Sequence, residues 1–186
     1  MMPSPDMSFP VPLIHISETN STNSYLQALC SKQQGVAAFT TVVADFQTSG
    51  RGQRGNSWES EPKKNLLFSF VLFPDFLEAR RQFLISQIVS LAIKEELDSY
   101  ADDFSIKWPN DVIASGKKLC GILTESSSDL EYINYVVVGI GVNCNQTEFP
   151  EEIREIASSI CLETGRTVDR TRLLAEFFNC FEVCYE

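Results

Sequence analysis

The sequence predicts an α+β fold, built on a mixed, mostly antiparallel sheet with helices packed on one face. Strand patterns follow one another directly at residues 118–125 and 131–143, and helical patterns are few and not regularly interleaved with strands. A doubly wound parallel sheet would need more crossover helices. The 186 residues, 44% of them hydrophobic and 11% aromatic, are enough for one domain with a sizeable core.

Six segments are predicted as strands because apolar and β-branched residues concentrate there: residues 11–16, 39–46, 66–73, 104–107, 118–125 and 131–143. Segment 66–73 is almost continuously apolar, which is typical of a central strand. The sequence Pro109-Asn110-Asp111 is typical of a turn.

Three segments are predicted as helices: residues 21–31, 80–100 and 169–185. Ser21 or Thr22 would cap the first helix, whose inner face carries Leu26, Leu29 and Cys30. Helical spacing also predicts the inner faces of the other two, which are Phe83, Leu84, Ile88, Leu91, Ala92 and Leu97 in the second and Leu174, Phe177, Phe178 and Phe181 in the third.

The formal net charge of −10 argues against a nucleic-acid-binding surface. The first ten residues lack the basic stretch and apolar run of a signal peptide. The longest apolar run, at residues 66–73, is too short to span a bilayer. We therefore expect a soluble cytoplasmic protein that has neither nucleic acid nor membrane as a partner.

Six cysteines and one histidine, His15, are present, and no two cysteines form a Cys-x-x-Cys pair. This composition argues against a zinc site and against a catalytic Cys–His or Ser–His pair. The cysteines are expected to be buried thiols in a reducing compartment. His15 falls in a predicted strand, where a structural role is the more common one.

Glycines and cations concentrate in one loop, which directly follows the predicted strand at 39–46 and reads Gly50-Arg51-Gly52-Gln53-Arg54-Gly55. Glycine lets backbone N–H groups approach a ligand closely, and the arginine fork matches carboxylate or phosphate oxygens. The loop therefore predicts a clamp for a small anion. A solvated turn is the alternative interpretation of the same composition.

The sequence Lys107-Trp108-Pro109-Asn110-Asp111 places a cation, an indole, an amide and a carboxylate side by side. Asp111 suits Mg²⁺, and Lys107 and Asn110 suit phosphate oxygens. The alternative is a turn with Trp108 in the core.

Two further positions suit a polar ligand. Lys118 enters an apolar strand, so its ammonium either snorkels to water or points into a pocket as a clamp for negative charge. Ser21-Thr22-Asn23 stands at a predicted helix start, where hydroxyl groups either cap the helix or bind a ligand.

In this order along the chain, these clusters resemble the catalytic domain of biotin–protein ligases. The resemblance extends roughly over residues 13–181, and it rests on Ser21-Thr22-Asn23, on Gln47-Thr48-Ser49-Gly50-Arg51-Gly52 with Trp58, on Lys107-Trp108-Pro109-Asn110-Asp111, on Lys118-Leu119-Cys120-Gly121-Ile122-Leu123-Thr124-Glu125 and on Gly139-Ile140-Gly141-Val142-Asn143.

The resemblance implies an ATP-dependent ligase that joins biotin to a lysine of a biotin carboxyl carrier protein. ATP, with Mg²⁺, activates the biotin carboxylate as biotinyl-5′-AMP and releases pyrophosphate. The carrier's lysine amine then attacks the mixed anhydride and expels AMP. Such chemistry needs cations and N–H donors aimed at negative charge, and it needs no nucleophilic side chain.

The resemblance also implies the site residues. The catalytic residues are Lys118, Arg51 and Asp111, and Asp111 is the metal ligand. Biotin and the nucleotide are assigned to Ser21, Thr22, Asn23, Gln47, Gly50, Arg51, Gly52, Gln53, Arg54, Gly55, Trp58, Lys107, Asn110, Lys118, Gly121 and Asn143.

The chain departs from the family's pattern at two places. Many members have arginines where this chain has Gln53 and Asn56, which predicts a more loosely held adenylate. We expect no DNA-binding domain before Leu13, and we expect the small C-terminal β-domain of many members to be absent or truncated after Glu186. We therefore expect residues 1–186 to be the catalytic domain, without a repressor role.

Two alternative functions stay open. One is a lipoate or octanoyl ligase or transferase of the same superfamily, with a longer apolar channel in place of a ureido pocket. The other is a non-catalytic biotin-binding sensor, against which the presence of Lys118 and Asp111 argues. An exposed sheet edge would also allow a homodimer.

Overall fold

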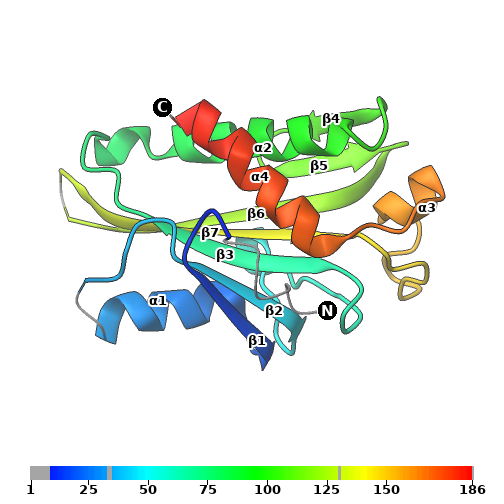
Figure 1. The fold of residues 1–186 in the computed structure, drawn as a ribbon, viewed down its shortest axis with the longest axis horizontal. Helices are drawn as coiled ribbons and strands as arrows, with labels where there is room; N and C mark the ends of the chain where they lie inside the picture. Colours follow the sequence, from blue (N-terminus) through cyan, green and yellow to red (C-terminus); the bar gives the residue numbers. More distant parts are fainter. Residues whose placement is uncertain (1–8, 33–34, 130, 186) are drawn as a thin grey trace.

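Within residues 9–32, 35–129 and 131–185, which the computed structural model describes, seven strands form one sheet in the order β1-β2-β3-β7-β6-β5-β4 (Figure 1). Their bounds are β1 Leu13–Thr19, β2 Thr41–Gln47, β3 Leu66–Leu72, β4 Phe104–Lys107, β5 Asp111–Ala114, β6 Lys117–Ser128 and β7 Ile133–Val142. The β1–β2 pair is parallel and the other five pairs are antiparallel. The mixed, mostly antiparallel sheet predicted from the sequence is confirmed.

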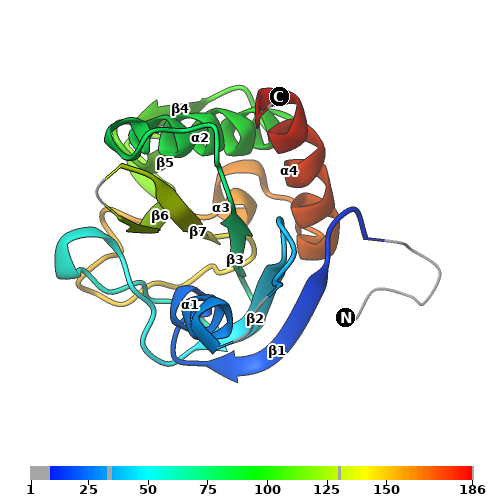
Figure 2. The same ribbon diagram turned by 90° about the vertical axis from the view of Figure 1, so that its left-hand side faces the viewer.

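Helices cover both faces of this sheet (Figures 1 and 2). Helices α2 (Phe83–Asp98) and α4 (Arg170–Tyr185) pack on the face to which Phe68 and Phe70 of β3 point. Helix α1 (Thr22–Lys32) connects the parallel strands β1 and β2 and packs on the opposite face, where Leu26 meets Val71. The expectation of helices on one face therefore holds for α2 and α4 and is wrong for α1. All seven residues of β3 are buried, which requires cover on both faces.

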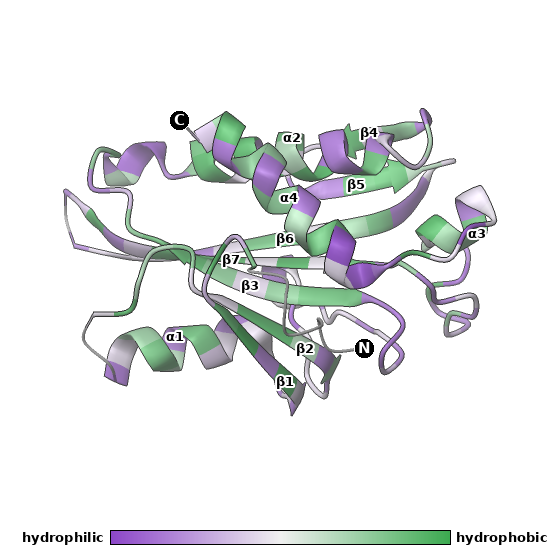
Figure 3. Ribbon diagram, in the orientation of Figure 1, coloured by the Kyte–Doolittle hydropathy of each residue, from purple (hydrophilic) through white to green (hydrophobic). Residues whose placement is uncertain are grey.

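The larger core lies between the sheet and α4 and is rich in phenylalanine. Phe70 meets Phe181 edge to face, with ring centroids 5.1 Å apart, and Phe68 meets Phe177 in the same way at 5.4 Å. The predicted inner face of the last helix is confirmed, because all four of its predicted residues are buried. Figure 3 shows the strands beneath this helix, β3 and β7, as largely hydrophobic.

The predicted inner face of helix α2 is confirmed at Ala92 and Leu97, which are buried, and is wrong at three other positions. Its buried apolar residues are Ile85, Val89, Ala92, Ile93 and Leu97, whereas the predicted core residues Phe83, Leu84 and Leu91 are exposed. The helix carries apolar residues around most of its circumference, so spacing alone does not fix which side faces the sheet. A separate 3₁₀ turn, Ala79–Arg81, precedes it and overlaps the start of the predicted helix at 80–100.

Two short elements were not predicted. Strand β5 begins at Asp111, within the predicted turn, and pairs with both β4 and β6 after a cis peptide bond between Trp108 and Pro109. Helix α3 (Ile160–Thr164) is only five residues long, and Ser159 caps it by accepting a hydrogen bond from the Leu162 N–H. Elements of four or five residues are too short for periodicity to reveal.

The expectations about residues 1–8 and about the chain end at Glu186 lie outside the described residues. Among the described helices, none is long and apolar enough to cross a membrane.

Glu96 of α2 is a buried carboxylate on the helix that packs against α4. Burial raises its pKa from 4.5 to about 7, and repulsion from Glu176 adds to the rise while Arg172 opposes it. The pKa in the folded state therefore lies above that of the unfolded chain. Ionisation of Glu96 opposes folding, so its contribution to stability falls as the pH rises from about 4.5 to about 7.

Glu96→Gln is expected to stabilise the protein at pH 8 by roughly 1–3 kcal/mol and to change little at pH 4, where Glu96 is protonated in both states. Urea unfolding at the two pH values measures the difference. Glu95→Gln, at the exposed neighbouring position, is the matched control and should leave both values unchanged. Equal stabilisation by Glu96→Gln at both pH values would contradict the assignment.

Candidate functional site

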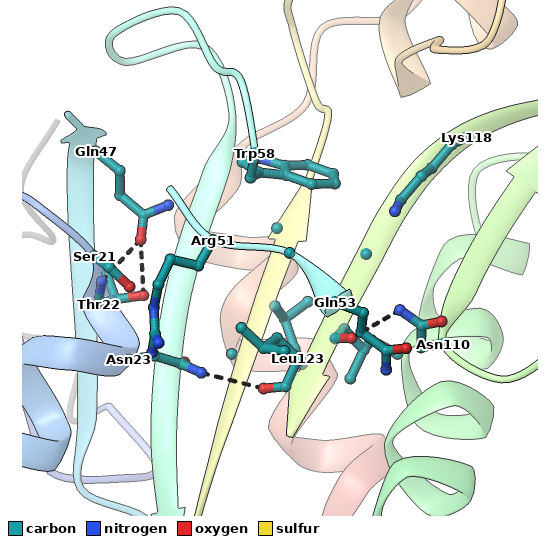
Figure 4. A pocket seen from close by; sticks show the side chains of 16 residues that line it. Ser21, Thr22, Asn23, Gln47, Arg51, Gln53, Trp58, Asn110, Lys118 and Leu123 are labelled. Atoms are coloured by element: carbon teal, nitrogen blue, oxygen red, sulfur yellow. Dashed lines mark hydrogen bonds between the residues drawn. The ribbon is translucent and has the colours of Figure 1, made fainter. Parts of the chain in front are cut away.

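A cavity lies on the α1 face of the sheet, where the loop after β2 crosses over β6 and β7 (Figure 4). Its walls come from the start of α1, the end of β2, the glycine loop, and the middle of β6 and β7. Eleven of the predicted site residues line it: Ser21, Thr22, Asn23, Gln47, Arg51, Gly52, Gln53, Trp58, Asn110, Lys118 and Gly121.

Glycines on β6 and β7 make room for this cavity. Gly121 and Gly141 are register partners, and Gly139 stands opposite Leu123. A Cβ atom at Gly141 would lie 2.6 Å from Trp58 Cε2, and one at Gly121 would lie 2.8 Å from Trp58 Cζ3. The floor of the cavity is therefore bare backbone, and any larger side chain there would displace the indole.

The indole of Trp58 lies on this glycine floor between the two ends of the cavity (Figure 4). Its Nε1 is buried and has no hydrogen-bond partner among the described residues. Lys118 Nζ lies 5.4 Å from the ring centroid, within range of a cation–π interaction. The aromatic wall thus borders on a positive charge, and its N–H faces the glycine floor.

One end of the cavity is polar, and its side chains Ser21, Thr22 and Gln47 are uncharged. Gln47 Oε1 accepts hydrogen bonds from the Thr22 backbone N–H at 2.8 Å and from Thr22 Oγ1 at 3.2 Å. The end of β2 therefore holds the first turn of α1, and Ser21 Oγ lies 3.5 Å from the Ser24 N–H that it caps. Both the capping and the ligand-binding interpretations of this segment remain compatible with its position, because the capping hydroxyls also line the cavity.

A second polar group continues under the cavity towards β6. Asn23 Nδ2 donates to Glu125 Oε2 at 2.8 Å and to the Leu123 carbonyl at 3.3 Å, and Asn23 Oδ1 lies 2.6 Å from Ser69 Oγ. Glu125 Oε2 also pairs with Arg51 Nη2 at 2.5 Å, so the side chain of Arg51 ties the glycine loop to β6. In Figure 4 this guanidinium points towards Asn23 and away from Lys118.

The other end of the cavity carries Lys118, near the start of β6. Its Nζ lies 2.8 Å from Asp111 Oδ1 of β5. That oxygen is buried and accepts no hydrogen bond of good geometry among the described residues, so the contact is an ion pair only. Asn110 Nδ2 donates to the Ile122 carbonyl at 3.1 Å, which leaves its Oδ1 available at the same end.

The glycine loop folds back on itself. The Gly52 N–H donates to the Asn56 carbonyl at 2.7 Å around a 3₁₀ turn, Gln53–Gly55, in which Arg54 has a left-handed backbone with φ of 55°. Gly50 must be glycine, because a Cβ there would lie 2.5 Å from the Trp58 carbonyl oxygen. The Trp58 N–H donates to the Gly50 carbonyl at 2.9 Å, and this hydrogen bond holds the two ends of the loop together.

Some predicted site residues do not line the cavity. They are Gly50, Arg54, Gly55, Lys107, Asp111 and Asn143, of which Asp111 reaches it through Lys118. Asn143 lies behind the cavity, where its Nδ2 donates to the Ser158 carbonyl at 3.0 Å. The exposed Trp108 packs against Phe83 of α2, with centroids 5.5 Å apart, and so belongs to neither the core nor the cavity wall.

Four residues that shape this cavity were given no site role from the sequence: Ser69, Glu125, Gly139 and Gly141. The last three stand in motifs that carry the resemblance. Ser69 was detectable as the one polar residue in the apolar segment 66–73. The two glycines recur at a spacing of two within a β-branched strand, which puts both on one face.

The thiols near the site are not candidates for nucleophiles. Cys120, next to Gly121, and Cys144 are completely buried, and burial raises the pKa of the Cys144 thiol to about 12 and that of Cys120 further. His15 Nε2 lies 3.3 Å from Asp45 Oδ1, and neither residue lines the cavity.

The biotin/lipoate A/B protein ligase family matches residues 16–143. The chain belongs to this family. The matched residues extend from β1 to the end of the predicted Gly139–Asn143 motif and so include every wall of the cavity.

Relatives within the family include the bifunctional ligase/repressor BirA of Bacillus spizizenii, which is 35% identical over 149 residues. The alignment spans 78% of this chain and 46% of that protein. The biotin–[acetyl-CoA-carboxylase] ligase of Mycobacterium tuberculosis is 30% identical over 175 residues, spanning 90% of this chain and 61% of that protein. The chain thus corresponds to about half the length of these relatives.

Solved structures of ligases match the fold over most of the chain. The biotin protein ligase of Aquifex aeolicus, in complex with biotin and ATP, is 36% identical with a TM-score of 0.80, over 93% of this chain and 69% of that one. The biotin protein ligase of Leishmania major in complex with biotin gives a TM-score of 0.77 over 95% of this chain and 75% of that one, at 24% identity. The α+β sheet is therefore the sheet of the family.

Gly141→Ala is expected to push the Trp58 indole off the floor of the cavity and expose it to water. In a Trp108→Phe background, where Trp58 is the only tryptophan, its fluorescence emission should move to longer wavelength. Trp108→Phe alone is the reference, and near-equal far-ultraviolet circular dichroism of the two proteins controls for folding. Unchanged emission would contradict the close approach of the indole to β7.

Proposed function

We propose that this chain catalyses the ATP-dependent ligation of biotin to a lysine of a biotin carboxyl carrier protein, through biotinyl-5′-AMP. The observation that carries the proposal is the cavity itself, in which a polar end and a lysine end are separated by one aromatic wall. Biotin has the same order of groups, a cyclic urea at one end and a carboxylate at the other. The named relatives act on biotin, and one related structure holds biotin and ATP together.

The polar end suits the urea of biotin. Ser21, Thr22 and Gln47 offer hydroxyl and amide groups to a ligand that both donates and accepts hydrogen bonds. The backbone of Arg51 and Gly52 borders the same space. Asn23 and Gly121 complete the walls around the bicyclic ring.

Lys118 is the group we assign to the first chemical step. A biotin carboxylate oxygen attacks the α-phosphorus of ATP, a new P–O bond forms, and pyrophosphate leaves with the electrons of the broken P–O bond. Two anions must approach each other, so a preorganised ammonium beside both lowers the barrier. The glycine loop, with Gly50, Arg54 and Gly55, would cover the adenylate and exclude water.

ATP and its Mg²⁺ are assigned to the Lys118 end of the cavity, beside the turn between β4 and β5. Lys107 and Asn110 would meet phosphate oxygens, and Asn143 supports the neighbouring loop. Asp111 offers a carboxylate oxygen that accepts no hydrogen bond, and among the described residues no three metal-ligating side chains come together. This donor set fits Mg²⁺, which commonly binds one carboxylate together with substrate phosphates.

The carrier protein enters in the second step. Its lysine amine attacks the biotinyl carbonyl carbon, an amide bond forms, and the C–O bond to AMP breaks. The amine loses a proton to solvent or to Asp111. Strands β1 and β4 stand at the two edges of the sheet, and we propose that such an edge also permits a homodimer.

Lys118→Ala is expected to lower biotin-dependent ATP–pyrophosphate exchange by about 100-fold or more, since it removes the cation beside the reacting carboxylate and phosphate. Its biotin affinity, measured by calorimetry without ATP, should fall far less. Lys117→Ala is the matched control, because that neighbouring ammonium contacts the Arg154 carbonyl at 3.3 Å instead.

Three results would overturn this assignment. Undiminished exchange in Lys118→Ala would remove the lysine from the mechanism. An unmutated chain that binds biotin and yields no exchange would support the biotin-binding sensor. Binding of lipoate in preference to biotin would favour the lipoate branch of the family.

Gln53 lines the cavity where many family members have an arginine, so we expect the adenylate to leave more readily. Gln53→Arg should reduce biotinylation of bystander lysines on an added non-carrier protein, measured by streptavidin blot. Gln87→Arg adds the same charge at an exposed position on α2, away from the cavity, and should leave bystander labelling unchanged. Equal labelling by the unmutated chain and Gln53→Arg would contradict the expectation.

A further inference from the structure

A continuous polar chain runs beneath the cavity from Thr22 to Arg51. Ser69 Oγ lies 2.7 Å from Thr22 Oγ1 and 2.6 Å from Asn23 Oδ1, and Asn23 Nδ2 donates to Glu125 Oε2 at 2.8 Å. Arg51 closes the chain on the same carboxylate oxygen. Ser69, Thr22 and Asn23 are all buried, with at most 4% of their surface exposed. Water therefore has little access to the hydrogen bonds among these three residues.

The carboxylate of Glu125 fixes the direction of each hydrogen bond in this chain. A carboxylate only accepts, so Asn23 must turn Nδ2 towards it, and the weaker contact to the Leu123 carbonyl favours the same orientation. Asn23 Oδ1 then faces Ser69 and can only accept, which takes the single hydroxyl proton of Ser69. Gly139 makes room for this amide, because a Cβ there would lie 2.2 Å from Asn23 Oδ1.

These fixed hydrogen-bond directions also determine where the hydroxyl proton of Thr22, at the cavity wall, can point. With the proton of Ser69 already used, the Thr22 hydroxyl has two protein acceptors within reach, Ser69 Oγ at 2.7 Å and Gln47 Oε1 at 3.2 Å. Its proton is directed into the protein, whichever acceptor takes it. Thr22 Oγ1 therefore presents only lone pairs to the cavity, and its preferred ligand group is an N–H or O–H donor.

We propose that Glu125 is a positioning residue that sets this hydrogen-bond polarity and so selects a ligand with an N–H donor at the polar end of the cavity. The inference rests on the proposed function. Biotin has ureido N–H groups at the required end, whereas the dithiolane ring of lipoate has no such donor. Glu125 thus acts on ligand choice through Asn23, Ser69 and Thr22, without touching the ligand itself.

Binding of biotin and of biotin methylated on its ureido nitrogens, measured by calorimetry without ATP, tests the proposal. Glu125→Gln removes the acceptor-only group, so Asn23 no longer has one imposed orientation. We expect biotin to bind about tenfold more weakly to Glu125→Gln than to the unmutated chain. The affinity for the methylated analogue should fall by less than about twofold. The quantity compared is the ratio of the affinity for biotin to the affinity for the methylated analogue. Both affinities are measured on the same protein, so this ratio does not depend on how much of a variant is folded. Glu78→Gln breaks an exposed Arg–Glu pair elsewhere and should not change the ratio.

The route of the effect is tested in two further backgrounds. In an Asn23→Ala background, Glu125→Gln should cause less than about a twofold further loss of biotin affinity, because the connection from Glu125 through Asn23 to Ser69 is already broken. In an Arg51→Ala background, Glu125→Gln should still lower the biotin affinity about tenfold. Equal losses for both ligands, or an effect that vanishes with Arg51→Ala and persists in Asn23→Ala, would overturn the proposal in favour of simple loop anchoring. An unmutated chain that binds no biotin would instead refute the proposed function.

Discussion

The close approach of side chains to bare backbone on β6 and β7 is the constraint on which the site depends. Trp58 and Asn23 occupy positions that a Cβ atom at Gly121, Gly139 or Gly141 would fill. The wall of the cavity and the amide beneath it therefore lie at the depth of the sheet itself. Since β6 and β7 pair with each other and with β5 and β3, respectively, this floor is rigid. A ligand would thus meet preorganised groups, which lowers the entropy lost on binding.

The larger hydrophobic core and the cavity lie on opposite faces of the sheet. On one face, the phenylalanines of β3 and α4 interlock with the apolar side of α2. On the other, the small core beneath α1 occupies only the part of the sheet near Val71 and Val137, and the rest is given to the cavity. Each central strand serves both, because its residues alternate between the faces. Ser69, between Phe68 and Phe70, is the clearest case, since one strand places its hydroxyl under the cavity and its neighbours in the core.

The sequence predicted most of the sheet and the walls of the site for physical reasons that also set the limits. Runs such as 66–73 and 133–142 are strongly patterned, so the strands were found. The inner face of α2 was predicted only in part, at Ala92 and Leu97. Leu84 and Leu91 are as apolar as Ile85 and Val89, so tertiary packing decides which of them is buried. Lys118, Asn110 and Thr22 were predicted as site residues from their motifs. The roles of Ser69 and Glu125 depend on neighbours 46 and 102 residues away along the chain, which no local pattern records.

Both cations that line the cavity already have a carboxylate partner, Lys118 with Asp111 and Arg51 with Glu125. In a chain of net charge −10, these pairs keep positive charge fixed in place without surrounding it with further cations. They differ in geometry, because the Asp111 oxygen at Lys118 accepts no hydrogen bond whereas Glu125 accepts from both Arg51 and Asn23. The Lys118 pair is therefore the weaker restraint, since only the Lys118–Asp111 contact itself holds it. Glu125 is held by two partners at the Arg51 pair, so the two cations of the cavity are restrained to different degrees.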